Sequence, residues 1–164
     1  MSALFGMGKN ENYDPSYKYM TAACTGVVIP ISELGDTIYS TGVLGDGYAV
    51  TTEGDKVFSP VSGIIEKISN NGHSYNIISD DGMKVLVHVG KDSKCDSMQP
   101  STPHIVEKET IAQGQLLCVI GCKQPDEDNK CIVEVVVSNS DKFDTFELLP
   151  QKVLDVKSSV LRYK

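Results

Sequence analysis

Residues 73–88 read HSYNIISDDGMKVLVH, the clearest structural signal in the chain. Two short runs rich in Val and Ile flank a polar turn, Asp80-Asp81-Gly82. This pattern is typical of a β-hairpin. We therefore expect antiparallel strands at Ser74–Ser79 and Lys84–Val89.

The length of the turn determines how the two histidines of this segment are related. If Asp80-Asp81 forms a two-residue loop, His73 lies directly opposite His88. If Asp81-Gly82 forms the loop, a favoured type I′ pair, His73 lies diagonally from His88. Both registers place the imidazoles on one face, with Cβ atoms about 5–8 Å apart. A three-residue loop would place them on opposite faces.

Similar short apolar runs continue on both sides of the hairpin, separated by turn signals such as Gly45-Asp46-Gly47 and Glu53-Gly54-Asp55. We expect further strands at Cys24–Ile31, Gly47–Thr52, Ser62–Ile68, Gln115–Ile120 and Cys131–Val137. Helical periodicity is weak, with at most a turn or two near Ser140–Phe146. The spacing predicts an all-β sandwich or barrel.

The 164 residues suit one compact domain, and no repeat or linker divides them. We expect a flexible N-terminal segment at 1–20 and a single domain at 21–164. The start at Met1 with a polar lead-in favours a free-standing protein, and a monomer is the default. The segment Ile31–Leu44 lacks strict alternation. It is either a loop that presents apolar side chains or an irregular strand packed on the core, and the strand is slightly favoured.

Composition excludes several classes of function. The net charge is −7 and no basic run is present, which is unfavourable for binding nucleic acid. No apolar stretch approaches the ~20 residues that span a bilayer, so stable membrane insertion is not expected. The five scattered cysteines indicate a reducing compartment rather than a disulfide framework. We interpret Cys118 and Cys131 as small core residues.

Two imidazoles on one face can bind a metal ion, exchange protons, or carry a phosphoryl group on one ring while the other donates to it. They can also be ordinary hydrogen-bonded strand residues. A zinc site needs three or four ligands, and only Asp92 and Asp96 lie near enough in sequence to be considered. Phosphoryl transfer needs a neutral ring, one nitrogen whose proton is held by an acceptor, and donors around the phosphorus. On the residues alone, these uses stay open.

The residues around His88, VLVHVGKD, suit phosphoryl transfer. Apolar neighbours exclude water, and Gly90 permits a close approach of backbone. Lys91 can add positive charge, although a solvated lysine is the commoner role. Asp92 can tune the site by hydrogen bonding or can stabilise a turn.

Four motifs occur along the chain: LGDGYAV at 44–50, SPVSGIIEKI at 59–68, GHSYNIISDDGMKVLVHVGKD at 72–92 and VVVSN at 135–139. In this order they resemble the glucose-type enzyme IIA of the phosphoenolpyruvate-dependent sugar phosphotransferase system. The resemblance begins at about Ala22. The two histidines with their flanking strands are the most specific of these features.

The resemblance implies an antiparallel β-sandwich of the hybrid-barrel kind. It implies a phosphotransferase component in which His88 accepts a phosphoryl group from the histidine phosphocarrier protein and passes it to a cysteine of a IIB domain. His73 would then be the second histidine, needed more for donating than for receiving. The implied location is cytoplasmic, transiently at the inner face of the membrane, with no cofactor. By position, an apolar face around the site would dock partners through Tyr39, Val43, Leu44 and Leu86.

Some positions depart from the family pattern. Asn71 stands where a hydroxyl residue, often Thr, is usual, and its amide can still hydrogen-bond a phosphate or a histidine. Val89 and Ser69 replace expected aromatic residues. The glycine-phenylalanine turn that normally follows the second histidine is missing, and KCDSMQPSTPHIVEKE stands at 94–109. These departures keep open a regulatory module on the same fold that has lost phosphotransfer and controls transporters or kinases.

Two other readings fit the residues less well. A zinc peptidase of the lysostaphin type needs a His-x-His pair, but Leu86 and Gly90 stand two residues before and after His88. A lipoyl or biotinyl carrier needs a lysine at a hairpin tip, and Lys56 is not in that setting.

Overall fold

The computed structural model describes residues 13–34, 41–91, 100–121, 131–149, 151–153 and 155–164. The described residues form strands and two single turns of 3-10 helix, and none of their helices is long and apolar enough to cross a membrane. The elements are β1 (Lys18–Thr21), β2 (Gly26–Pro30), η1 (Ile31–Glu33), β3 (Asp46–Thr52), β4 (Lys56–Phe58), β5 (Gly63–Ile68), β6 (Ser74–Ser79), β7 (Lys84–Lys91), β8 (Thr102–Pro103), β9 (Thr110–Ile111), β10 (Leu116–Val119), β11 (Cys131–Val137), η2 (Ser140–Lys142), β12 (Phe146–Leu148), β13 (Gln151–Val153) and β14 (Ser159–Tyr163).

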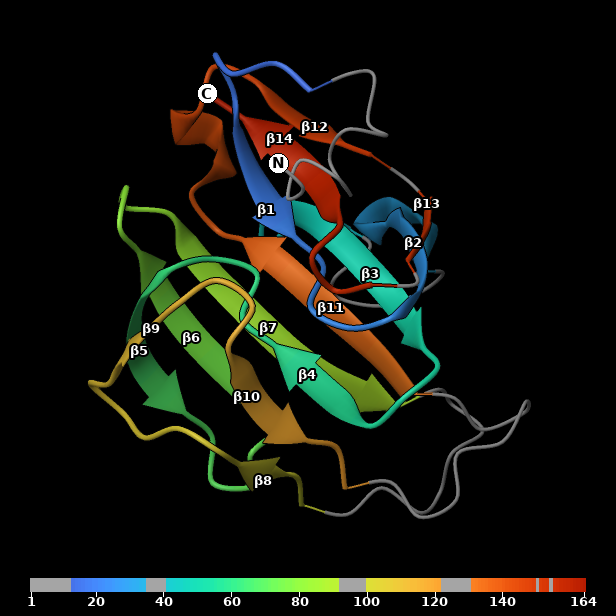
Figure 1. Cartoon of the computed structure of the whole chain (residues 1–164), viewed down its shortest axis with the longest axis vertical. Coiled ribbons are helices and arrows are strands. Elements are labelled where there is room, and N and C mark those ends of the chain that lie inside the picture. The colour runs from blue at the N-terminus through green and yellow to red at the C-terminus, as the bar shows by residue number, and fades with distance from the viewer. Residues whose placement is uncertain (1–12, 35–40, 92–99, 122–130, 150, 154) are drawn as a thin grey trace.

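These strands pair into one large sheet and two small ones (Figure 1). The large sheet has eight strands in the order β13-β2-β3-β11-β7-β6-β5-β9, and the small sheets are β1-β14-β12 and β4-β10-β8. Every described pairing is antiparallel. The predicted antiparallel all-β fold is therefore confirmed.

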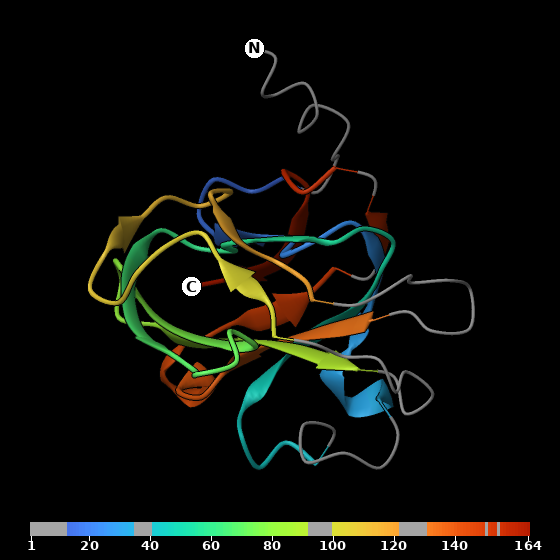
Figure 2. The same cartoon turned by 90° about the horizontal axis from the view of Figure 1, so that it is seen from below.

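Alternation along the strands explains why the sheets pack face to face, since neighbouring side chains point to opposite faces. On β11, Val133, Val135 and Val137 are buried in the main core. The small sheets contribute Met20, Val57 and Leu161 to the same core. Figure 2 shows η1 and the turn at 41–45 on the other side of the large sheet. The large sheet thus has an inner face in the core and an outer face that is only partly covered.

The β6–β7 hairpin closes with three residues, 80–82, so both two-residue loops predicted from the sequence are wrong. The amide of Ser79 donates to the carbonyl of Met83 at 2.9 Å, and Gly82 has φ +86°. Asp81 accepts hydrogen bonds from Ser79, from Lys18 of β1 and from Tyr163 of β14. These contacts hold Asp81 in the loop and fix its length.

The hairpin register follows from this loop. Ser74 pairs with His88, and the amide of Val89 donates to the carbonyl of His73 at 2.7 Å. In a regular pleat His73 would therefore lie on the face opposite His88. His73 precedes the first residue of β6, however, and is only partly buried, whereas Val89 is buried. The expectation that strand pairing itself brings the two imidazoles to one face is wrong.

Two other expectations need correction. β1 begins at Lys18 and pairs with β14, and Met20 is fully buried. The final residues of the predicted flexible segment 1–20 therefore belong to the fold. Within Ile31–Leu44, residues 35–40 lie outside the described residues, and the described parts form η1 and a turn rather than the slightly favoured irregular strand.

The predicted core cysteines are confirmed. Cys118 and Cys131 are buried in the main core, and Cys24 is buried there as well. Burial raises the pKa of Cys24 to about 12 and that of Cys118 to about 11. These two thiols are therefore protonated at neutral pH, which makes them unreactive as nucleophiles.

Candidate active site

The candidate site lies on the outer face of the large sheet, where β7 runs beside β11. His88 pairs directly with Glu134, and Leu86 pairs with Val136. Because side chains two residues apart share a face, all four lie on the outer face while their neighbours fill the core. The sheet therefore places a histidine, a carboxylate and an apolar patch side by side.

His88 contacts a carboxylate that the sequence analysis did not identify. Its Nδ1 lies 2.9 Å from Glu134 Oε1, within hydrogen-bond distance. The side chain of His88 is 27% exposed and that of Glu134 is 8% exposed. The imidazole is thus reachable from solvent, while the carboxylate behind it is buried.

Gly90 was predicted to permit a close approach of backbone, but the group beside it is the Glu134 carboxylate. A Cβ at position 90 would lie 2.9 Å from Oε1 and 3.1 Å from Oε2. Separations below about 3.4 Å are closer than ordinary van der Waals contact. The absence of a side chain at Gly90 therefore leaves the space that the carboxylate fills.

Asn71 was predicted to contact a phosphate or a histidine, and it contacts the main chain of His73. The His73 amide donates to Asn71 Oδ1 and to Ser69 Oγ, each at 3.1 Å. The Ser69 hydroxyl also donates to Asn71 Oδ1 at 2.8 Å. These bonds hold the backbone of His73 just before β6 begins.

Two of the predicted site residues, Asp92 and Tyr39, lie outside the described residues. The third histidine, His104, is exposed and lies outside the segment 73–88 in the sequence. Among the described side chains, no group of three or more His, Cys, Asp and Glu is placed to hold a metal ion.

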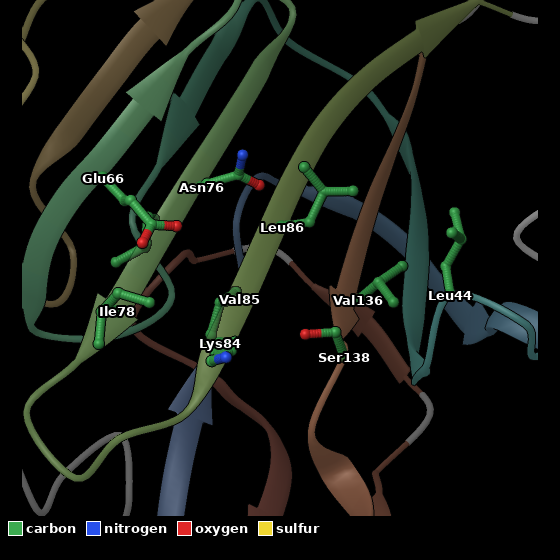
Figure 3. A pocket seen from close by; sticks show the side chains of 10 residues that line it. Leu44, Glu66, Asn76, Ile78, Lys84, Val85, Leu86, Val136 and Ser138 are labelled. Carbon is green, nitrogen blue, oxygen red and sulfur yellow. The ribbon is translucent and has the colours of Figure 1, made fainter.

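A depression of about 250 Å³ lies on the outer face, and its lining includes Leu86, two residues before His88 on β7. Leu86, Val136 and Leu44 line its apolar part, and Figure 3 shows them on β7, on β11 and on the segment leading into β3. These side chains belong to a small outer cluster that also includes Ile31 and Ala49. The structure therefore brings the predicted docking residues Leu44 and Leu86 together. The rest of the lining comprises Glu66, Asn76, Ile77, Ile78, Lys84, Val85 and Ser138.

Val43, also predicted for docking, is 78% exposed, more than any other large hydrophobic side chain among the described residues. It directly precedes Leu44, which lines the depression. Val43 therefore adds to the apolar surface of Leu44, and it is contiguous apolar surface that marks interaction sites.

A comparison with protein families identifies the family of the chain. The model of the phosphoenolpyruvate-dependent sugar phosphotransferase system domain EIIA 1 matches residues 18–143. The chain belongs to this family. This match confirms the resemblance seen in the motifs. EIIA domains are phosphotransferase components that act as phosphocarriers in sugar phosphotransferase systems.

Curated relatives of this EIIA chain are components of sugar phosphotransferase systems. The chain is 34% identical over 92 residues, 56% of its length, to the glucose-specific EIICBA component of Streptococcus pneumoniae. It is 32% identical over 132 residues, 80% of the chain, to the beta-glucoside-specific EIIBCA component of Bacillus subtilis. It is 30% identical over 138 residues, 84% of the chain, to the mannose-specific EIIBCA component of Corynebacterium glutamicum. The EIIA chain spans only 13%, 22% and 20% of the lengths of these relatives, respectively.

A solved structure shares the fold of this EIIA chain. Glucose permease IIA from Mycoplasma capricolum superposes with a TM-score of 0.70, covering 89% of this chain and 95% of its own. The two sequences are only 19% identical over this match. The likeness therefore concerns the β-sandwich architecture.

Proposed function

We propose that this EIIA chain accepts a phosphoryl group on His88 from the histidine phosphocarrier protein and passes it to a cysteine of a IIB domain. The observation that carries the proposal is a partly exposed imidazole that contacts a buried carboxylate, on the sheet face that also holds the depression lined by Leu86. The exchange takes place in the cytoplasm, transiently at the inner face of the membrane where a permease presents its IIB domain.

Both transfers are displacements at phosphorus. In the first, a ring nitrogen of His88 attacks the phosphorus, the new P–N bond forms, and the P–N bond of the donor histidine breaks with its electron pair. In the second, a IIB thiolate attacks and His88 leaves. No cofactor is needed, because positioning and electrostatic stabilisation supply most of the catalysis in such transfers.

His73 is the proposed second histidine, acting mainly when the group is donated. Its main chain is fixed by Ser69 and Asn71 and bonds to β7 one residue beyond His88. This anchoring supports the assignment because it keeps the residue beside the reacting strand. Asn71 then acts by fixing His73, and the hydroxyl expected at position 71 is not required for that bond.

Partners are proposed to dock on the apolar depression and on Val43. The Val43→Asp variant should transfer the group about 5–30-fold more slowly, since one apolar anchor is worth about 1–2 kcal/mol of docking energy. Its fold should be unchanged because the side chain is 78% exposed. The measurement is the rate of phosphorylation by limiting phosphocarrier protein.

The matched control for this variant is Val106→Asp. Val106 is also strongly exposed, at 66%, but lies between β8 and β9, outside the depression. Equal phosphorylation rates for Val43→Asp and Val106→Asp would mean that partners do not dock at Val43.

The phosphocarrier proposal is tested by intact-mass analysis. The chain is incubated with phosphoenolpyruvate, enzyme I and the histidine phosphocarrier protein, and one acid-labile phosphoryl group is expected. A chain that stays unmodified while the phosphocarrier protein is labelled would contradict the proposal. That result would favour the regulatory module that controls transporters or kinases through the same face.

A further inference from the structure

Glu134 is a charged residue in an otherwise apolar strand. β11 reads CIVEVVV, and six of its seven residues, Glu134 among them, are buried. Burying a carboxylate is costly unless a partner compensates for the lost hydration. Within the described part of the chain, the polar group that contacts this carboxylate is His88 Nδ1. The placement of Glu134 is therefore explained by His88 rather than by packing.

Two further features hold the carboxylate at this position. Glu134 and His88 are direct register partners on β11 and β7, so their backbones present both side chains to the same face. Gly90 leaves room for both carboxylate oxygens, because a Cβ there would approach each of them within 3.1 Å. Strand register and a missing side chain thus direct Glu134 to one edge of the imidazole.

We propose that Glu134 is a positioning residue for phosphoryl transfer through His88. This rests on the function proposed above. A carboxylate can only accept a hydrogen bond, so it selects the ring tautomer with the proton on Nδ1. Nε2, on the other side of the ring, then presents the lone pair that attacks phosphorus. The same carboxylate stabilises the positive charge that develops on the ring while the P–Nε2 bond forms, as the carboxylate partner of a catalytic histidine does elsewhere.

The proton balance of the step supports this role. The P–N bond of the donor histidine breaks and the P–Nε2 bond of His88 forms, while the Nδ1 proton stays in its hydrogen bond to Glu134. No proton has to enter or leave the His88 ring on acceptance. When a IIB thiolate takes the group, the P–S bond forms and the P–Nε2 bond breaks, and the Nδ1 proton again stays on the ring. Glu134 therefore contributes to both the acceptance and the donation of the phosphoryl group.

The test compares wild type with Glu134→Gln and Glu134→Leu. Gln keeps the shape but can donate to Nδ1 as well as accept from it, and Leu removes the hydrogen bond. The control is Glu147→Gln, because Glu147 is paired with Arg162 in a small sheet away from the site. Circular dichroism checks folding. The readouts are the ¹⁵N spectrum of the unphosphorylated His88 ring and the single-turnover rate of phosphorylation.

We expect the Nδ1–H tautomer in wild type and in Glu147→Gln, and a loss of that preference in both Glu134 variants. Phosphorylation should slow about 10–100-fold, more for Leu than for Gln, the range found when the hydrogen-bond partner of a metal-binding histidine is removed. Unchanged ring spectra in folded Glu134 variants would overturn the proposal, whatever the rates. An unlabelled wild type would instead overturn the phosphocarrier function, and the ring spectra would then decide the tautomer assignment separately.

Discussion

The His88→Gln variant should take up no phosphoryl group from the phosphocarrier protein, whereas wild type should take up one. Glutamine has an amide in place of the imidazole and cannot form the phosphohistidine bond. The change should leave the apolar core undisturbed, because His88 is partly exposed on the outer face and belongs to neither apolar cluster. Intact-mass analysis under limiting and excess donor measures this loss.

The matched control is His104→Gln, the same substitution at an exposed histidine outside the motif. It should be labelled like wild type. Labelling of His88→Gln at the wild-type level would show that another residue accepts the group. A peptide map of the labelled chain would then identify that residue.

Strand positions in this protein could be predicted because they depend on local pattern. The runs at 74–79 and 131–137 are rich in β-branched residues, and the structure has strands at Ser74–Ser79 and Cys131–Val137. Strands of two or three residues, such as β8 and β9, are too short to show an alternation of apolar and polar residues. Their pairing partners define them, so the sequence gives no local signal for them.

The hairpin register could not be predicted from the hairpin itself. Its loop is set by Asp81, which bonds to Lys18 and Tyr163, residues that are 63 and 82 positions away. Turn statistics favour Asp81-Gly82 as a two-residue type I′ loop, but they include only neighbouring residues. The tertiary contacts decide the loop instead. A difference of one residue moves His73 to the other side of a regular pleat.

His88 could be proposed from the sequence because the family motif surrounds it, whereas Glu134 lies 46 positions away. Its signal was visible as a lone carboxylate within the apolar run Cys131–Val137. What sequence alone could not supply was the order of strands in the sheet. β11 lies between β3 and β7, and this order brings Glu134 to His88.

The same strand order explains the second glycine of the motif Gly45-Asp46-Gly47. Gly47 lies within β3, and a Cβ there would lie 1.8 Å from the carbonyl oxygen of Val135 on β11. No side-chain rotation can relieve a clash between Cβ and backbone, so the strands must separate. Gly47→Ala should therefore lower the free energy of unfolding by on the order of 3–5 kcal/mol, a change reached only by severe packing defects.

Urea denaturation followed by far-UV circular dichroism measures this loss for Gly47→Ala, and Gly54→Ala is the matched control. At Gly54 the nearest atom to an added Cβ is Thr25 Oγ1 at 3.9 Å, so its stability should change by less than about 0.5 kcal/mol. Equal midpoints for the two variants would mean that β3 and β11 approach less closely than described. Because a domain is typically stable by about 5–15 kcal/mol, the loss at Gly47 is expected to unfold a measurable share of the chain. The unfolded share would also lose phosphoryl acceptance, since β11 and β7 together hold Glu134 against His88.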